Sequence, residues 1–160
     1  MAAQSISQRL SAAPPFSYRA DPTVPPFPDD KALLVFDGVC VLCSGFARFI
    51  LKRDRGFAFR LTTAQSLLGQ ALFRHYGLDT HEFETNLVLA DGRAWAKLDT
   101  VALAGERLGG PWRALSLLRL LPHRLADWLY DRVARNRYAL FGRTERCMIP
   151  PPEWRDRFIA

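Results

Sequence analysis

The sequence is poor in cysteine and has no long apolar run. Three cysteines among 160 residues are too few for a disulfide-stapled secreted scaffold, and the odd number leaves one of them without an obvious mate. The longest apolar candidate, residues 115–121, is broken by Arg119 and stopped by Pro122, well short of the roughly 20 residues of a membrane span. We therefore expect a soluble protein with no membrane span and a cytoplasmic location.

Acidic residues are also in the minority, because 22 lysines and arginines face 16 aspartates and glutamates and leave a net charge of +6. Much of the excess is arginine between residues 132 and 146. Such a cluster is typical of a solvated face, and an anionic partner is the alternative. No zinc finger, helix-turn-helix or aromatic RNA-binding motif accompanies the charge, so we expect no nucleic-acid partner.

Length and composition fit one domain, with 49% apolar residues for its core. Residues 1–29 differ from the rest, because prolines recur between residues 14 and 28 and no acidic residue precedes Asp21. We interpret this stretch as a flexible proline-rich leader with extended, solvated backbone, and an organelle-targeting peptide is the alternative. Residues 30–160 are then the folded domain with a helical C-terminal extension.

The folded part shows alternating strand and helix patterns. The expected elements are a strand over 31–37, a helix over 41–54, an uncertain strand over 57–61, a helix over 64–76, a hairpin over 86–98 and a helix from 99 to 110. Further helices follow, broken at Pro111 and Pro122, with core candidates Trp112, Leu115, Leu118, Leu125, Trp128, Leu129 and Val133. This order predicts an α/β fold of thioredoxin-like type, with a central mixed sheet of about four strands flanked by helices and extra C-terminal helices.

Two thiols lie three residues apart where the first strand gives way to the first helix. The apolar run 33–36 precedes them, and Cys40 falls at the start of the helix. Helix periodicity turns Cys43 toward the core and leaves Cys40 at the rim. Unpaired N–H groups at a helix start stabilise a thiolate, so Cys40 is the candidate attacking thiol and Cys43 the resolving one.

Two other interpretations of this pair stay open. Free cysteines are often inert core residues. Alternatively, Cys40 and Cys43 supply two zinc ligands, which Cys147 and one of His75, His81 or His123 would complete. If the pair is redox-active, the electrons reside on sulfur, and no cofactor is expected.

Several neighbours of the pair are candidates for supporting roles. Asp37 either accepts or relays the proton that Cys43 must lose, or it only stabilises the turn and caps the helix. Gly38 permits a backbone conformation or a close approach that a side chain would block. Cys147 is either a third redox centre, with its thiolate favoured by nearby arginines, or a lone thiol in a tail.

Arg135, Asn136, Arg137 and Tyr138 form a polar group on the expected last helix. They line a groove that binds an acidic partner or a glutathione-like carboxylate, or they cap and solubilise the helix.

The segment 34–43, with Asp37, Cys40 and Cys43, resembles the signature of the DCC family, a thioredoxin-like group of thiol-disulfide oxidoreductases. The stretch 134–143, followed by Cys147, is similar to the C-terminal part of that family. The resemblance implies a thioredoxin-like fold, a reactive Cys40–Cys43 pair and a functional Asp37. For a redox-active pair we expect a thiol or disulfide substrate, either a protein or a small thiol, and a reductant that the sequence does not identify. A non-catalytic binding module with the same fold is the alternative function.

The sequence departs from thioredoxins at two places. Thioredoxins have a cis-proline before the third strand, beside the sulfurs, whereas residues 84–87 contain no proline here. The resemblance places Thr85 in that stretch, among the supporting residues with Arg137. Val41 and Leu42 separate the cysteines, so the redox potential of thioredoxins cannot be transferred to this pair.

Overall fold

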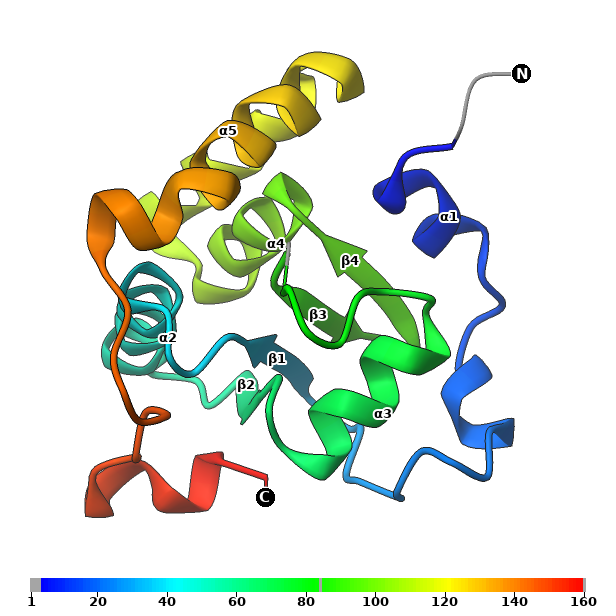
Figure 1. Ribbon diagram of the computed structural model, residues 1–160, viewed down its shortest axis with the longest axis vertical. Coiled ribbons are helices and arrows are strands. Elements are labelled where there is room, and N and C mark those ends of the chain that lie inside the picture. The colour runs from blue at the N-terminus through cyan, green and yellow to red at the C-terminus, as the bar shows by residue number, and fades with distance from the viewer. Residues whose placement is uncertain (1–3, 84, 160) are drawn as a thin grey trace.

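The computed structural model describes residues 4–83 and 85–159, and a four-stranded mixed sheet lies at its centre (Figure 1). The strands are β1 (Ala32–Phe36), β2 (Phe59–Thr63), β3 (Leu87–Ala90) and β4 (Arg93–Ala96). Their order is β2-β1-β3-β4, with β1 and β2 parallel and the other two pairs antiparallel. The architecture is α/β and consistent with the predicted thioredoxin-like fold.

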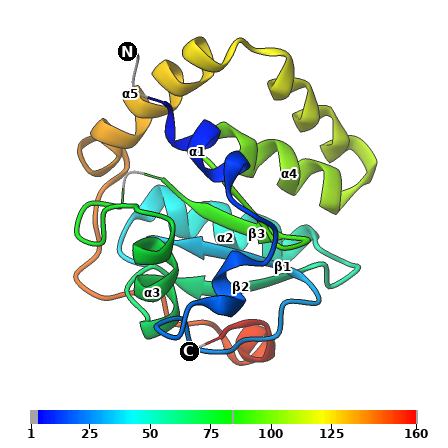
Figure 2. The same ribbon diagram turned by 90° about the vertical axis from the view of Figure 1, so that its right-hand side faces the viewer.

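Helices cover both faces of the sheet. Leu33 and Val35 of β1 pack with residues of α1 (Ile6–Ala12) and α3 (Leu67–His75). The alternate residues Leu34 and Phe36 pack on the opposite face with α2 (Val41–Arg53) and α4 (Leu98–Leu108). Figure 2 shows α1 and α3 on the near side of the sheet and α2 behind it. Because both faces are covered, every residue of β1 is buried, which explains its unbroken apolar run.

Most predicted elements of the central domain are present within a few residues of their expected bounds. The predicted hairpin is β3–β4, and its turn residues Asp91 and Gly92 have φ of 53° and 78°, the positive values that this two-residue turn requires. The uncertain strand near residue 57 is β2, which begins two residues later. Ser66 caps α3 by accepting a hydrogen bond from the N–H of Gly69.

The expectation of extended, solvated backbone before residue 30 is wrong for part of this segment. Ser5 and Gln8 form a capping box that starts α1. The buried side chains of Leu10 and Tyr18 join the core on the α3 side of the sheet. The prolines all follow α1 and do not interrupt it, and the apolar residues between them find room against the sheet. The domain boundary near residue 30 stays a prediction.

The C-terminal helices pack differently from the prediction. A 3-10 helix, η2 (Gly110–Leu120), follows α4, and α5 (His123–Phe141) begins after Pro122. The core candidates Leu125, Trp128, Leu129 and Val133 are 41–55% exposed, so these four assignments are wrong. Only Ala126 and Arg137 are buried on α5, because this helix crosses one end of the molecule and is not sandwiched against the sheet. No helix in the described part of the chain is both long and apolar enough to cross a membrane.

The chain then returns along the sheet to a last 3-10 helix, η3 (Pro152–Arg157). Residues 142–148, which we call the cover segment, descend from the end of α5 past the start of α2 (Figure 1). Beyond them, Arg157 forms a buried ion pair with Asp54, and the N–H of Ile159 donates to the carbonyl oxygen of Leu61 at 2.8 Å. The C-terminal end is therefore anchored on β2.

Candidate functional site

The two cysteines lie at the start of α2, as the strand–turn–helix pattern predicts. Cys40 is the N-cap residue, and its Sγ accepts a hydrogen bond from the N–H of Cys43 at 3.2 Å. The positive end of the helix dipole points at this sulfur. A thiolate at Cys40 therefore has a backbone donor in place before any substrate arrives.

The surroundings shift the pKa values of the two thiols in opposite directions. The pKa of Cys40 falls from 9.0 to about 7, chiefly because the Cys43 thiol hydrogen-bonds to it and also through the Cys43 N–H and the positive charge of Arg137. The same hydrogen bond, together with burial, raises the pKa of Cys43 far above its usual range. One sulfur is thus prepared to carry the negative charge and the other to keep the proton.

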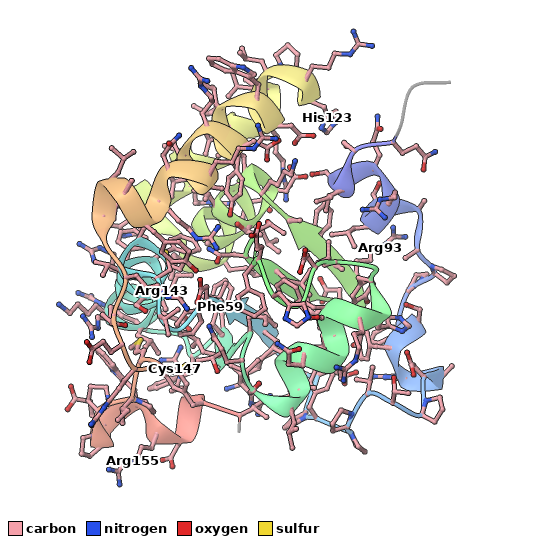
Figure 3. All side chains as sticks on the ribbon, viewed as in Figure 1. Phe59, Arg93, His123, Arg143, Cys147 and Arg155 are labelled. Atoms are coloured by element: carbon pink, nitrogen blue, oxygen red, sulfur yellow. The ribbon has the colours of Figure 1, made fainter. Side chains whose placement is uncertain are left out.

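Both thiols of the pair are buried, and Cys43 packs in the core as its helix position predicts. Cys40 is fully buried, whereas Cys43 retains 9% exposure. The expectation that Cys40 faces the rim is wrong, because helix periodicity takes no account of a distant segment that returns over the helix start. Arg143 of the cover segment pairs with Cys40 as an isolated antiparallel β-bridge. Figure 3 labels Arg143 and Cys147 along this segment beside α2.

Backbone hydrogen bonds fasten the cover segment to the loop that carries the thiols. The N–H of Thr144 donates to the carbonyl oxygen of Val39 at 2.8 Å, and the N–H of Met148 donates to that of Gly38 at 2.9 Å. The Thr144 hydroxyl also donates to Val39 at 3.2 Å. These bonds hold the cover segment against the loop that carries Cys40.

Asp37 is the centre of a buried network at the end of β1, where it is 1% exposed. Its carboxylate accepts hydrogen bonds from the Gln65 side chain at 2.7 Å and from the N–H of Val39 at 3.1 Å. The Tyr138 hydroxyl also donates to it, and Arg137 forms an ion pair with it at 3.5 Å. The structure thus brings Asp37 and Arg137 together from positions 100 residues apart.

Gly38 lies against Cys147 of the cover segment. A Cβ built on Gly38 would lie 2.9 Å from Cγ2 of Thr63 and 3.3 Å from Cβ of Cys147. Gly38 is therefore required for close approach and not for a positive φ. The predicted effect of nearby arginines on Cys147 is wrong, because burial and then the charge of Asp37 raise the pKa of this thiol. All three cysteines are free thiols.

A small apolar pocket opens on the side of Cys43. Its volume is about 150 Å³, and Cys43, Phe46, Thr85, Tyr130 and Val133 are among the lining residues. Thr85, one of the expected supporting residues, lies on this wall, and its hydroxyl oxygen accepts a hydrogen bond from the N–H of Lys97 at 2.7 Å. Burial raises the pKa of Tyr130, whose hydroxyl accepts a hydrogen bond from the N–H of Asn86.

A larger, basic cleft adjoins this pocket. It has a volume of about 590 Å³, and Lys97, Arg135, Arg137, Tyr138 and Arg143 contribute to its walls. Arg137 also lines the apolar pocket, so the two cavities share a wall. The structure thus brings three of the four predicted groove residues to one cleft. The fourth, Asn136, is exposed and donates instead to the carbonyl oxygen of Arg132 on its own helix.

The zinc alternative lacks its further ligands. The described residues contain no group of three or more histidine, cysteine, aspartate or glutamate side chains placed to hold a metal ion. His75 lies instead against Asp21 at 2.7 Å and Ser17 at 2.9 Å, on the opposite face of the sheet. The cysteine pair therefore has no metal-binding partners in this part of the chain.

Comparison with known proteins bears on the same residues. The model of the DCC1-like thiol-disulfide oxidoreductase family matches residues 34–143. The chain belongs to this family. The uncharacterized protein YuxK of Bacillus subtilis is 38% identical over 127 residues, which are 79% of this chain and 93% of that protein. The chloroplastic DCC family protein At1g52590 of Arabidopsis thaliana is 32% identical over 122 residues, 76% of this chain and 71% of that protein. No solved structure matches significantly.

Family membership supports thiol–disulfide chemistry in general. The matched range contains Asp37, Cys40, Cys43 and Arg137, whereas Cys147 lies beyond its end. Sequence reasoning missed Gln65, which is the second residue after β2. Because β1 and β2 are parallel, their carboxyl ends meet at one edge, and this rule would have placed Gln65 near Asp37.

No comparable signal identifies Tyr130 or Lys97. Both contact the site through the packing of α5, from which Asp131 reaches the Lys97 Nζ at 3.0 Å. Lys97 also has a positive φ of 56°, which no local turn motif predicts.

Proposed function

We propose that this DCC family protein exchanges thiols and disulfides through the Cys40–Cys43 pair, with Cys40 as the attacking thiolate. One observation carries the proposal: two free thiols lie at a helix start, and the sulfur of the first accepts a hydrogen bond from the backbone N–H of the second. The lowered pKa of Cys40, about 7, favours its thiolate near neutral pH, and the thiolate is the species that attacks a disulfide.

The reaction proceeds in two displacements. The Cys40 thiolate attacks one sulfur of a substrate disulfide, forms a mixed disulfide and releases the first substrate thiolate. Cys43 then loses its proton to solvent or to the leaving thiolate and attacks the Sγ of Cys40. The second substrate thiol leaves, the protein holds a Cys40–Cys43 disulfide, and two electrons have passed to the substrate. A dithiol reductant regenerates the pair.

The pKa shifts support this division of roles. Loss of the negative charge on Cys40 in the mixed disulfide removes the interaction that holds the proton on Cys43, so the resolving thiol becomes more acidic only when it is needed. Asp37 makes no hydrogen bond to either sulfur among the described contacts, and its proton-acceptor role stays a prediction. Its proposed contribution is to hold Arg137, whose charge lowers the pKa of Cys40.

Stoichiometry with a chromogenic disulfide tests the proposal. In a Cys147→Ser background, 4,4′-dithiodipyridine should release two thiopyridones per chain and leave no label on the protein. Adding Cys43→Ser should release one thiopyridone and leave a mixed disulfide on Cys40, detected by mass. Adding Cys40→Ser instead should slow the reaction at least tenfold. Equal rates and equal labelling for the two single-cysteine variants would contradict the assigned roles.

A further inference from the structure

Two of the four cationic side chains that line the basic cleft form no ion pair with a described carboxylate. Four cationic side chains line it against the two carboxylates of Glu82 and Asp131. Lys97 is buried and paired with Asp131 at 3.0 Å. Arg135 and Arg143 are exposed, and neither forms an ion pair with a described carboxylate.

Arg137 is buried yet weakly satisfied. Only 7% of the residue is exposed. Its contacts are long, at 3.3 Å to the carbonyl oxygen of Ala134, 3.2 Å to the Tyr138 hydroxyl and 3.5 Å to Asp37. Its Nε–H is buried and has no acceptor among the described residues. A buried guanidinium with an unmet donor is costly unless a further oxygen reaches it.

The cleft lies directly beside the sulfurs. Arg143, on one wall, is the residue whose backbone pairs with Cys40, and Arg137, on another, also lines the apolar pocket that opens on Cys43. The guanidinium groups of both arginines lie over the ring of Tyr138, at 4.6 and 5.3 Å from its centroid. Arg137 and Arg143 therefore connect the cleft to the surroundings of the thiol pair.

We propose that this cleft binds the carboxylate groups of a low-molecular-weight thiol or its disulfide, with the apolar pocket taking the part next to its sulfur. The proposal rests on the thiol–disulfide exchange proposed above and names its substrate class. Guanidinium groups pair with carboxylates through two parallel hydrogen bonds, which accounts for arginine on the walls. The cleft volume of about 590 Å³ is in the range of small-molecule sites.

Two aromatic disulfides that differ in charge test this specificity. Reaction rates in the Cys147→Ser background are measured with 5,5′-dithiobis(2-nitrobenzoate), which has two carboxylates, and with uncharged 4,4′-dithiodipyridine. The double variant Arg135→Gln/Arg143→Gln should slow the carboxylated disulfide about tenfold and change the uncharged one less than twofold. Without the arginine substitutions, the ratio of the rate with the carboxylated disulfide to the rate with the uncharged one should also fall at high salt.

A charge-matched double variant is the control for long-range attraction. Arg124 and Arg132 are exposed on the same helix α5 and do not line the cleft. Arg124→Gln/Arg132→Gln removes the same two charges and should change the rate with the carboxylated disulfide less than twofold. Equal losses in the two double variants, or no loss in either, would overturn the carboxylate site.

A binding measurement on a protein that cannot react tests the carboxylate site independently of the exchange reaction. The Cys40→Ser/Cys43→Ser protein cannot exchange, and calorimetry with S-methylglutathione should show binding that Arg135→Gln/Arg143→Gln weakens about tenfold. Binding without Cys40-dependent reaction in the parent would contradict the proposed function alone. Reaction without carboxylate preference or arginine-dependent binding would overturn the substrate class alone.

Discussion

At the scale of single residues, Cys40 and Cys43 show how one hydrogen bond divides two identical thiols. The donor thiol of Cys43 lowers the pKa of its partner and raises its own, and Arg137 and Asp37 act on both with opposite signs. The hydrogen bond from Cys43 is the largest influence on the Cys40 pKa, and the charges of Arg137 and Asp37 adjust it further.

Titration of the thiolate absorbance at 240 nm should show a transition near pH 7 that Cys40→Ser abolishes. Arg137→Gln should move the transition to higher pH, because it removes a positive charge that stabilises the thiolate. Arg137→Lys should restore most of the shift, whereas Arg132→Gln should leave it unchanged. A transition near pH 9 in the parent protein would contradict the assigned acidity.

The free energy of unfolding should depend on pH through the ionisation of Cys40 and Cys43. The folded chain binds the Cys40 proton more weakly than the unfolded chain, because the pKa falls from 9.0 to about 7. The free energy of unfolding should therefore rise between pH 7 and 9 relative to Cys40→Ser, and this gain is lost as the pH falls through 7. Above pH 9 stability should decline, since folded Cys43 keeps a proton that the unfolded chain releases. Denaturant unfolding under reducing conditions measures both changes.

Asp37→Asn should destabilise the protein by about 3 kcal/mol, because it leaves the buried Arg137 without its counter-ion. It should also lower the pKa of Cys40, whose thiolate the carboxylate opposes. Denaturant unfolding and the 240 nm titration measure these effects. Asp156→Asn, at an exposed position of η3, is the control and should change neither quantity. If Asp37→Asn has the same free energy of unfolding as the parent protein, the only role left for Asp37 is to stabilise the turn.

At the scale of elements, we expect the cover segment to limit access to Cys40, to which Arg143 is joined by a β-bridge. It is extended backbone that contacts the thiol loop through a β-bridge and a few hydrogen bonds, so its local opening should need far less free energy than global unfolding.

Thr144→Pro should expose Cys40, because proline removes the N–H that donates to Val39 at 2.8 Å. One such bond contributes about 1 kcal/mol, so alkylation of Cys40 by iodoacetamide at pH 7 should accelerate roughly fivefold to tenfold. Thr144→Val keeps this N–H and removes only the hydroxyl, so it should accelerate the reaction less. Equal, fast alkylation in parent and variant would show that the segment does not protect the thiol.

The same scale shows what the sequence can predict. Strand, turn and first helix follow from an apolar run, a glycine and a 3.6-residue period around Cys40, and all of these signals are local. Burial of Cys40 depends instead on residues 142–148, about 100 positions away, and no local pattern encodes that contact. The core assignments on α5 are wrong for a related reason. Periodicity identifies the apolar face of an amphipathic helix, but it does not show whether another element covers that face.

At the scale of the whole molecule, the segment before the sheet contributes to one of the two core clusters. Leu10 of α1 is 3% exposed and packs with residues of the sheet and α3. We propose that this segment folds together with the domain and is not an independent leader.

Leu10→Ala should lower the free energy of unfolding by about 2–4 kcal/mol, because it removes buried methyl groups and leaves a cavity. Leu120→Ala, at a site that is 80% exposed, should change it by less than about 0.5 kcal/mol. Urea unfolding monitored by tryptophan fluorescence provides both values. A Leu10 variant as stable as the parent would show that α1 docks too weakly to belong to the folded unit.

The cover segment is fastened at both of its ends. On one side Tyr138 and Arg137 tie α5 to Asp37, and on the other Arg157 ties η3 to Asp54. A segment with one free end could swing away from the thiol loop, but a segment anchored at both ends can only bow outward. We therefore expect slender disulfides to react with Cys40 faster than disulfides on the broad surface of a folded protein, because the C-terminal end is anchored on both sides of the thiol loop.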